Sequence, residues 1–156
     1  MELTHAQDGY PRYRHDWDTF LVPPDEAAAW VAEIDGEIVG HVAVHRGPAE
    51  PTYPLAQQTA GLTPEQLGVL ARLLISPYAR RQGLARRLIE TATAYAEQEG
   101  IRLVLDVLQE TTVAIAAYER LGWRRLGELI LPIAGRPDLD LWVYLSPEPT
   151  PSGPED

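Results

Sequence analysis

The sequence has no cysteine and no lysine among its 156 residues. Without cysteine, the chain can form no disulfide, no catalytic thiolate and no cysteine-ligated metal site. This absence agrees with a reducing cytoplasm, which is the location we expect. No apolar run approaches the roughly 18 residues that a membrane-spanning helix needs, and the polar start lacks the apolar core of a signal peptide. We therefore expect no membrane partner.

Positive charge is also scarce. The chain has 13 basic residues, all of them arginine, against 23 acidic ones, for a formal charge of −10. Such a surface argues against nucleic-acid binding, which needs a basic footprint, and mildly favours amine-bearing partners. Four of the arginines nevertheless gather at Arg80, Arg81, Arg86 and Arg87. An acidic chain that concentrates its positive charge in one stretch indicates a local anion site.

Length and a hydrophobic content of 45% predict one globular domain, which we place at residues 1–145. The remaining segment, 146–156, is rich in proline and acidic residues and is expected to be a flexible tail. A hairpin over Ala28–Val44 turns at Asp35-Gly36, a dipeptide typical of two-residue turns. Residues 46–64 are rich in proline, glycine and alanine and are interpreted as a long loop, either a lid over a substrate or a tolerated insertion.

The second half of the chain alternates strands and helices. The predicted elements are a buried strand Leu67–Ile75, a helix Gly83–Glu99, a strand Ile101–Leu108, a helix from Thr111 or Thr112 to Leu121, and strands Trp123–Ile130 and Leu139–Leu145 joined by Pro132–Pro137. Because a helix joins the two buried strands, they should be parallel with a right-handed crossover. The fold class is therefore α+β, a layered domain with a mixed, mostly antiparallel twisted sheet and a central splayed parallel pair.

The stretch RRQGLA, residues 80–85, stands where the first of these helices begins. Glycine lets the backbone approach an anion closely, and the first N–H groups of a helix can point at one phosphate. Arg80 and Arg81 can add charge-assisted hydrogen bonds. These residues alone predict a generic phosphate site, and a plain helix start with solvated arginines is the alternative.

RRQGLA also resembles motif A of the GNAT superfamily of N-acetyltransferases, Gln/Arg-x-x-Gly-x-Gly/Ala. Upstream, LLISPYA is similar to the apolar strand and proline that precede this motif in the family. Downstream, AIAAYERLGW is similar to the family's second helix, which ends in Tyr-x-x-x-Gly-aromatic. The resemblance covers roughly Ala28–Leu145 and implies the GNAT-like acyl-CoA N-acyltransferase fold.

The resemblance further implies an acetyl-CoA site and no metal. The turn would hold the pyrophosphate, and the backbone of the preceding strand would pair with the pantetheine arm as an added strand does. An N–H at Leu73 would bond the thioester carbonyl, on which negative charge grows as an amine attacks. The cofactor-binding residues expected on this basis are Leu73, Leu74, Ile75, Arg80, Arg81, Gln82, Gly83, Leu84, Ala85 and Thr111.

Tyr118 falls on the family's tyrosine, and the resemblance implies that it protonates the departing CoA thiolate. Some relatives carry a catalytic glutamate on the strand before motif A, but this strand has Arg72 and no acid. A base must then come from elsewhere or act through water. The candidates, which the sequence does not rank, are Glu33, Glu37, Glu65 and Asp106.

The implied activity is direct transfer of an acetyl group from acetyl-CoA to a primary amine of a small molecule or peptide. A non-catalytic acetyl-CoA-binding sensor of the same fold is the alternative, and the family's habit leaves a homodimer open. Family members usually begin with a strand and a helix before the hairpin. No convincing strand precedes Ala28, so we expect the first strand to be missing or very irregular.

Overall fold

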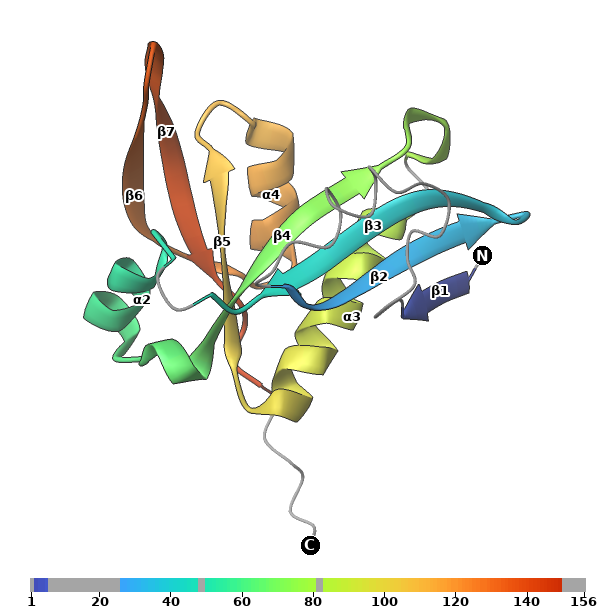
Figure 1. Cartoon of the computed structure of the whole chain (residues 1–156), viewed down its shortest axis with the longest axis horizontal. Coiled ribbons are helices and arrows are strands. Elements are labelled where there is room, and N and C mark those ends of the chain that lie inside the picture. The colour runs from blue at the N-terminus through green and yellow to red at the C-terminus, as the bar shows by residue number, and fades with distance from the viewer. Residues whose placement is uncertain (1, 6–25, 48–49, 81–82, 150–156) are drawn as a thin grey trace, which may run out of the picture.

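The computed structural model describes residues 2–5, 26–47, 50–80 and 83–149 (Figure 1). Within these residues, one mixed sheet contains β1 (Glu2–His5), β2 (Glu26–Ile34), β3 (Glu37–His45), β4 (Leu67–Ile75), β5 (Arg102–Leu108), β6 (Arg124–Ile133) and β7 (Arg136–Leu145). Their spatial order is β1-β2-β3-β4-β5-β7-β6. The helices are α2 (Tyr53–Ala60), α3 (Leu84–Glu99) and α4 (Thr112–Arg120), with short 3₁₀ turns at Pro64–Gln66 and Pro77–Ala79. The predicted α+β class is confirmed.

The expected hairpin is formed by β2 and β3. Asp35 and Gly36 both have positive φ, 52° and 81°, as a primed two-residue turn requires. Gly40 lies where the sheet meets α3, and a Cβ there would stand 3.1 Å from Leu88 Cδ1 and 3.2 Å from Ile75 Cδ1. Glycine at this position therefore lets the helix approach the sheet closely.

The first strand corrects our expectation. β1 is regular and pairs antiparallel with β2, from Glu2 opposite Glu33 to His5 opposite Trp30. Four residues are too few for an alternating pattern to be recognised in the sequence. The strand forms because the outer edge of β2 would otherwise leave its backbone N–H and C=O groups unpaired.

The parallel pair is confirmed. β4 and β5 pair in parallel and are joined through α3, which lies behind the sheet in Figure 1. Gly83 and Gly100 are the N-cap and C-cap residues of α3. Gly100 has a φ of 73°, and its N–H bonds to the carbonyls of Ala96 and Glu97 cap the last turn.

Two connecting segments differ from prediction. The segment 46–64 is not wholly a loop, because it contains α2, with Pro54 in the first helical turn, where proline is tolerated. The connection between β6 and β7 is a tight turn at Ala134 and Gly135 rather than Pro132–Pro137. The two strands consequently extend as a long hairpin, with Ile133 opposite Arg136 (Figure 1).

The sheet buries residues on both faces. On one face, α3 and α4 enclose the main core, which includes Leu84, Leu88, Leu103, Leu105 and Tyr144. On the opposite face, α2 covers a second cluster made by Tyr53, Ala56, Leu67, Val69, Val104 and Leu145. Side chains of β4 and β5 alternate between these two clusters, so residues of one strand can be assigned to a face.

Ser146, the first residue of the expected tail, is packed into the fold. It is buried, its N–H donates to the Leu103 carbonyl (2.8 Å), and its Oγ accepts from the Leu103 N–H (3.0 Å). Arg102 also donates to the Ser146 carbonyl. The chain therefore stays attached to β5 for one residue beyond β7, and residues 150–156 lie outside the described part.

Candidate active site

The centre of the candidate site is the point where β4 and β5 separate. The parallel partners are Leu67 with Arg102, Gly68 with Leu103, and Val69 with Val104, and within the described residues the pairing goes no further. Beyond Val69, the edge of β4 that turns toward β5 therefore has no partner strand among the described elements. Such an edge can accept an extended ligand as an added strand.

β4 bends at Arg72, which has a φ of 55°. Its register with β3 shifts between His41 and Ala43, as expected for a bulge. A non-glycine residue in this left-handed region costs on the order of 1–3 kcal/mol, and such residues concentrate at functional sites. The bulge lies just past Val69, the last residue of β4 that pairs with β5.

His41 holds this bulge from β3. Its Nδ1 lies 2.8 Å from the carbonyl oxygen of Arg72. Since a carbonyl only accepts, Nδ1 carries the proton. His41 is 5% exposed, and burial lowers its pKa. The imidazole is thus neutral while it donates this bond.

The three cofactor-binding residues expected on β4 follow the bulge. Leu73 and Ile75 pack against the main core, whereas the side chain of Leu74 is 53% exposed. Their side chains are therefore accounted for by packing or solvent, and their backbone would provide any contact with a pantetheine arm.

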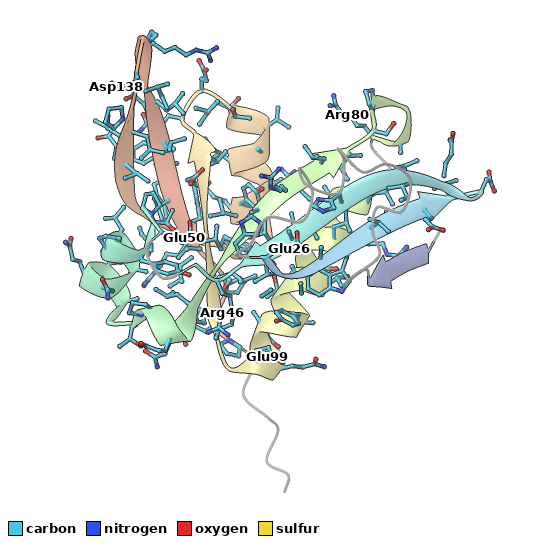
Figure 2. All side chains as sticks on the ribbon, in the orientation of Figure 1. Glu26, Arg46, Glu50, Arg80, Glu99 and Asp138 are labelled. Atoms are coloured by element: carbon cyan, nitrogen blue, oxygen red, sulfur yellow. The ribbon has the colours of Figure 1, made fainter. Side chains whose placement is uncertain are left out.

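The turn after β4 leads into α3. Gly83 is the N-cap residue, has a φ of 75°, and has no described atom within 4 Å of the place where a Cβ would stand. Arg80 is exposed, at the upper right of Figure 2, whereas Arg81 and Gln82 lie outside the described residues. Leu84 is buried and Ala85 partly so, which leaves their N–H groups as the possible ligand contacts. An open glycine at a helix N-terminus fits a phosphate group.

Tyr118 lies in α4, on the face of the sheet that carries α3. It is 8% exposed and packs against Trp123 and Tyr144, with ring centroids 5.8 and 6.4 Å away. Burial, with a smaller effect from the charge of Asp106, raises the pKa of Tyr118 to about 12. The phenol therefore stays protonated at neutral pH and can serve as a donor. Thr111 is the N-cap residue of α4, is exposed, and makes no side-chain capping bond.

One of the four candidate bases lies at the strand separation. Asp106 is two residues past Val104, the last parallel partner, and shares with it the face opposite α3. Asp106 is exposed as a residue, yet the surrounding protein desolvates its carboxyl enough to raise the pKa. Glu33 and Glu37 flank the distant β2–β3 turn, and Glu65 lies in the 3₁₀ turn before β4. Position thus ranks Asp106 first.

Sequence reasoning missed Glu26. It begins β2 opposite His45, near the centre of the molecule in Figure 2. Its Oε1 is buried and has no hydrogen-bond partner among the described residues. Burial raises the pKa of Glu26 to about 7, against the opposing effect of Arg72. An acid at a strand start is typical of a surface residue, and only the strand register places it beside β3 and β4.

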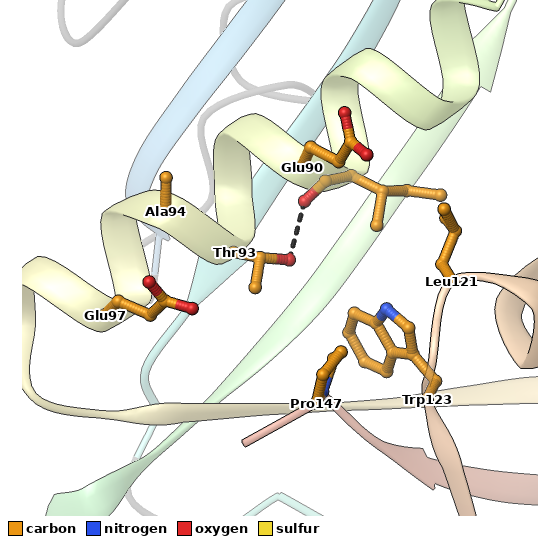
Figure 3. Close-up of a pocket in the computed structure, with 8 residues that line it drawn as sticks. Glu90, Thr93, Ala94, Glu97, Leu121, Trp123 and Pro147 are labelled. Carbon is orange, nitrogen blue, oxygen red and sulfur yellow. Dashed lines mark hydrogen bonds between the residues drawn. The ribbon is translucent and has the colours of Figure 1, made fainter. Parts of the chain in front are cut away.

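A pocket of about 270 Å³ lies elsewhere, between α3 and the segment after α4 (Figure 3). It is lined by residues that include Thr93, Glu97, Leu121, Trp123 and Pro147. The Thr93 hydroxyl donates to the Ile89 carbonyl (2.7 Å), so α3 satisfies it internally. This pocket includes none of the predicted site residues.

Over the described part of the chain, no three His, Cys, Asp or Glu side chains gather in a way that could hold a metal ion. No helix in that part is long and apolar enough to span a membrane.

Comparison with known proteins places the chain in a family. The model of the acetyltransferase (GNAT) family matches residues 2–123, from β1 to just past α4. The chain belongs to the GNAT acetyltransferase family. The match begins at β1, which agrees with the presence of that strand.

Among curated relatives of this GNAT chain, N-acetyltransferase family 8 member 3 of Rattus norvegicus is 34% identical over 110 residues, covering 69% of this chain and 42% of the relative. N-acetyltransferase 8 of the same species is 30% identical over 125 residues, covering 78% and 50%. The chain thus spans half or less of the length of these two relatives.

Solved structures share the fold. One is yncA from Salmonella typhimurium with its cofactor acetyl-CoA, with a TM-score of 0.60 and 18% identity, covering 82% of this chain and 68% of that one. Another is ribosomal-protein-alanine N-acetyltransferase from Brucella melitensis, with a TM-score of 0.59 and 23% identity, covering 76% and 67%.

Proposed function

We propose that this GNAT protein is an N-acetyltransferase that moves the acetyl group of acetyl-CoA directly to a primary amine. The observation that carries the proposal is the separation of β4 from β5 after Val69, with Tyr118 on one face of the sheet and Asp106 on the other. The two groups that a proton-coupled acyl transfer needs therefore flank the place where the sheet opens.

The residues present fit acetyl-CoA. Gly83, open and left-handed at the start of α3, would receive the pyrophosphate together with the N–H groups of Leu84 and Ala85. Arg80 and, from the resemblance, Arg81 and Gln82 would complete this contact. The edge of β4 after Val69, which lacks a partner among the described strands, would pair with the pantetheine arm, and the Leu73 N–H would stabilise charge on the acyl oxygen.

Acetyl-CoA supplies an activated thioester. A new C–N bond forms between the amine and the acetyl carbon, and the C–S bond breaks. The amine must lose a proton, which Asp106 accepts directly or through water from the face opposite α3. Tyr118 gives its proton to the departing sulfur, which its high pKa permits because the phenol is protonated before the step.

The test is acetyl transfer by the full chain to a broad panel of amines, followed as free thiol and as acetylated product. Tyr118→Phe keeps the packing against Trp123 but removes the proton, so we expect kcat to fall by about 100-fold or more with unchanged CoA affinity. Tyr95→Phe is the matched control, because Tyr95 lies on α3 and packs edge-on against Trp30 of β2, away from the site.

Asp106→Asn should lower kcat/KM by a similar factor, whereas the exposed neighbour Glu110→Gln should not. Tight CoA binding without transfer to any amine would refute catalysis and leave the sensor alternative. An unchanged kcat in Tyr118→Phe would remove this tyrosine from the mechanism.

A further inference from the structure

We infer that Tyr144 of β7 positions Tyr118, the proposed proton donor, through a hydrogen bond to Glu119 in the last turn of α4. The inference rests on the proposed function above. Tyr144 is a positioning residue rather than a catalytic one, because it acts on the reaction only through Tyr118. Three observations support this role: the sparse burial of α4, the geometry of the Tyr144 hydroxyl, and the place of Tyr144 in the sheet.

α4 buries little of itself apart from Tyr118. All of its residues are described, and Tyr118 alone among them is buried. Within the described part of the chain, the N-cap residue Thr111 makes no side-chain capping bond, and Val113 in the first turn is 81% exposed. Ala114 and Ile115 are only half-buried where they pack against the main core. The start of α4 therefore does little to fix how the helix is rotated against the sheet.

A polar contact at the other end of α4 ties the helix to β7. The Tyr144 hydroxyl donates to Glu119 Oε2 over 2.6 Å and accepts from Arg125 Nε over 3.1 Å. The phenol thus uses both its donor and its acceptor capacity, which orients its proton toward the carboxylate. A hydroxyl-to-carboxylate bond of this length is charge-assisted and belongs to the stronger class of hydrogen bonds. Glu119, the residue next to Tyr118, is therefore held at a defined place on the sheet.

Arg125 supports this bond from β6. It stands opposite Tyr144 in the antiparallel pair, and its guanidinium carbon lies 4.2 Å from the centroid of the Trp142 ring. Its Nη2 lies 3.4 Å from Glu119 Oε2, but the two side chains are 40% and 49% exposed, and an ion pair this exposed adds little by itself. The main contribution of Arg125 is therefore to orient the Tyr144 hydroxyl.

Tyr144 is a fixed point for this contact because strands flank it on both sides. It is 0% exposed and lies opposite Leu105 of β5 and Arg125 of β6. Its ring centroid is 6.4 Å from that of Tyr118. Tyr144 thus acts on Tyr118 twice, through ring packing and through the bond to the neighbouring Glu119. Tyr144→Phe keeps the ring and removes the bond, so it isolates the second effect.

The experiment measures kcat and CoA affinity of the full chain for Tyr144→Phe, Tyr118→Phe and the double variant, with an amine that wild type acetylates. We expect Tyr144→Phe to lower kcat by about 5- to 50-fold, the cost of a slightly misplaced group, and to change CoA affinity by less than about twofold. In the Tyr118→Phe background the same substitution should change kcat by less than about twofold, because no proton donor remains to be positioned. A merely structural role would instead multiply the two losses.

Tyr53→Phe is the matched control. Tyr53 is also a buried tyrosine whose hydroxyl makes a hydrogen bond, to the Leu67 carbonyl at 3.3 Å, but it lies in α2 on the opposite face of the sheet. Tyr53→Phe and Tyr144→Phe should each lose a few degrees in Tm, as expected for one buried hydrogen bond, whereas Tyr53→Phe should keep the wild-type kcat. Glu119→Gln keeps an acceptor for the Tyr144 hydroxyl and should retain most of kcat, and Glu119→Ala should match Tyr144→Phe.

Equal fold-losses of kcat from Tyr144→Phe in the wild-type and Tyr118→Phe backgrounds would overturn the inference while leaving N-acetyl transfer standing. So would a wild-type kcat in Tyr144→Phe. If Tyr118→Phe itself keeps the wild-type kcat, or if no amine of any kind is acetylated, the proposed function fails first and this inference falls with it.

Discussion

Gly83 offers a sharp test of the proposed cofactor site, because the chain contains its own control. Gly83 and Gly100 flank the same helix, have φ of 75° and 73°, and have no described atom within 4 Å of the place where a Cβ would stand. An added methyl group would therefore meet the same backbone strain and no clash at either end. Of the two, Gly83 lies at the helix N-terminus, where a phosphate group would bind.

Replacing either glycine with alanine forces an L-residue into the left-handed region, at roughly 1–2 kcal/mol. For a chain of this size each variant should lose a few degrees in Tm, about 2–4 °C per kcal/mol. The two should therefore be destabilised alike. CoA affinity should separate them, because the methyl group of Gly83→Ala would occupy the space through which the pyrophosphate approaches the backbone.

Calorimetric titration with CoA, beside thermal unfolding of each variant without ligand, gives both quantities. We expect Gly83→Ala to weaken CoA binding by at least about tenfold, or ~1.4 kcal/mol, and Gly100→Ala to leave it unchanged. Equal CoA affinity in the two variants, with similar Tm, would show that the turn before α3 does not hold the cofactor.

Two further predictions concern Glu26 and Gly40. Because burial raises the folded-state pKa of Glu26 to about 7, the folded protein binds its proton more tightly than the unfolded chain between about pH 4.5 and 7. Its contribution to the free energy of unfolding therefore falls as pH rises through that window. Glu26→Gln lacks this loss, so its free energy of unfolding should increase relative to that of wild type from about pH 4.5 to about 7. If urea unfolding gives the same difference between the two proteins at every pH, this reasoning is contradicted. Gly40→Val should destabilise the fold by about 1–3 kcal/mol, since even a Cβ lies 3.1 Å from Leu88 and 3.2 Å from Ile75, and an unchanged urea midpoint would show that α3 shifts freely on the sheet.

The elements that the sequence predicts correctly are those whose signals are local. The Asp35-Gly36 turn, the apolar run of β4 and the glycines at both ends of α3 each specify their conformation within a few residues. Family resemblance then identifies the turn before α3 and Tyr118 as candidate site residues. Neither feature alone is specific for an acetyltransferase.

The elements that the sequence missed depend on tertiary contacts. β1 exists because β2 offers an edge, and α2 forms in a proline-rich segment because Tyr53 and Ala56 bury against β4 and β5. Pro132 and Pro137 suggested a loop, yet they are accommodated within the two-stranded hairpin, where β6 is an edge strand.

The site was missed for the same reason wherever it depends on register. Nothing in the sequence marks Arg72 as the bulge of β4, because arginine is not a residue that favours a positive φ. Glu26 lies far from Arg72 along the chain, and only the pairing of β2, β3 and β4 brings their charges together. The sequence names Asp106 among four candidate bases but does not rank them. Asp106 is favoured only by its position just past the last parallel pair, which the sequence does not show.

Two groups near the bulge respond differently to pH: His41 supports the backbone, and Glu26 titrates. His41 fixes the bulge by donating to the Arg72 carbonyl, and burial lowers its pKa, so this bond is kept as pH changes around neutrality. Burial raises the pKa of Glu26 to about 7, against the opposing charge of Arg72, so Glu26 changes charge in that same range. The hydrogen bond that holds the bulge is therefore kept around neutrality, while the charge of Glu26 changes there. A change in kcat/KM near pH 7 that arises from Glu26 should be abolished by Glu26→Gln, whereas a change that persists in this variant would belong to another group.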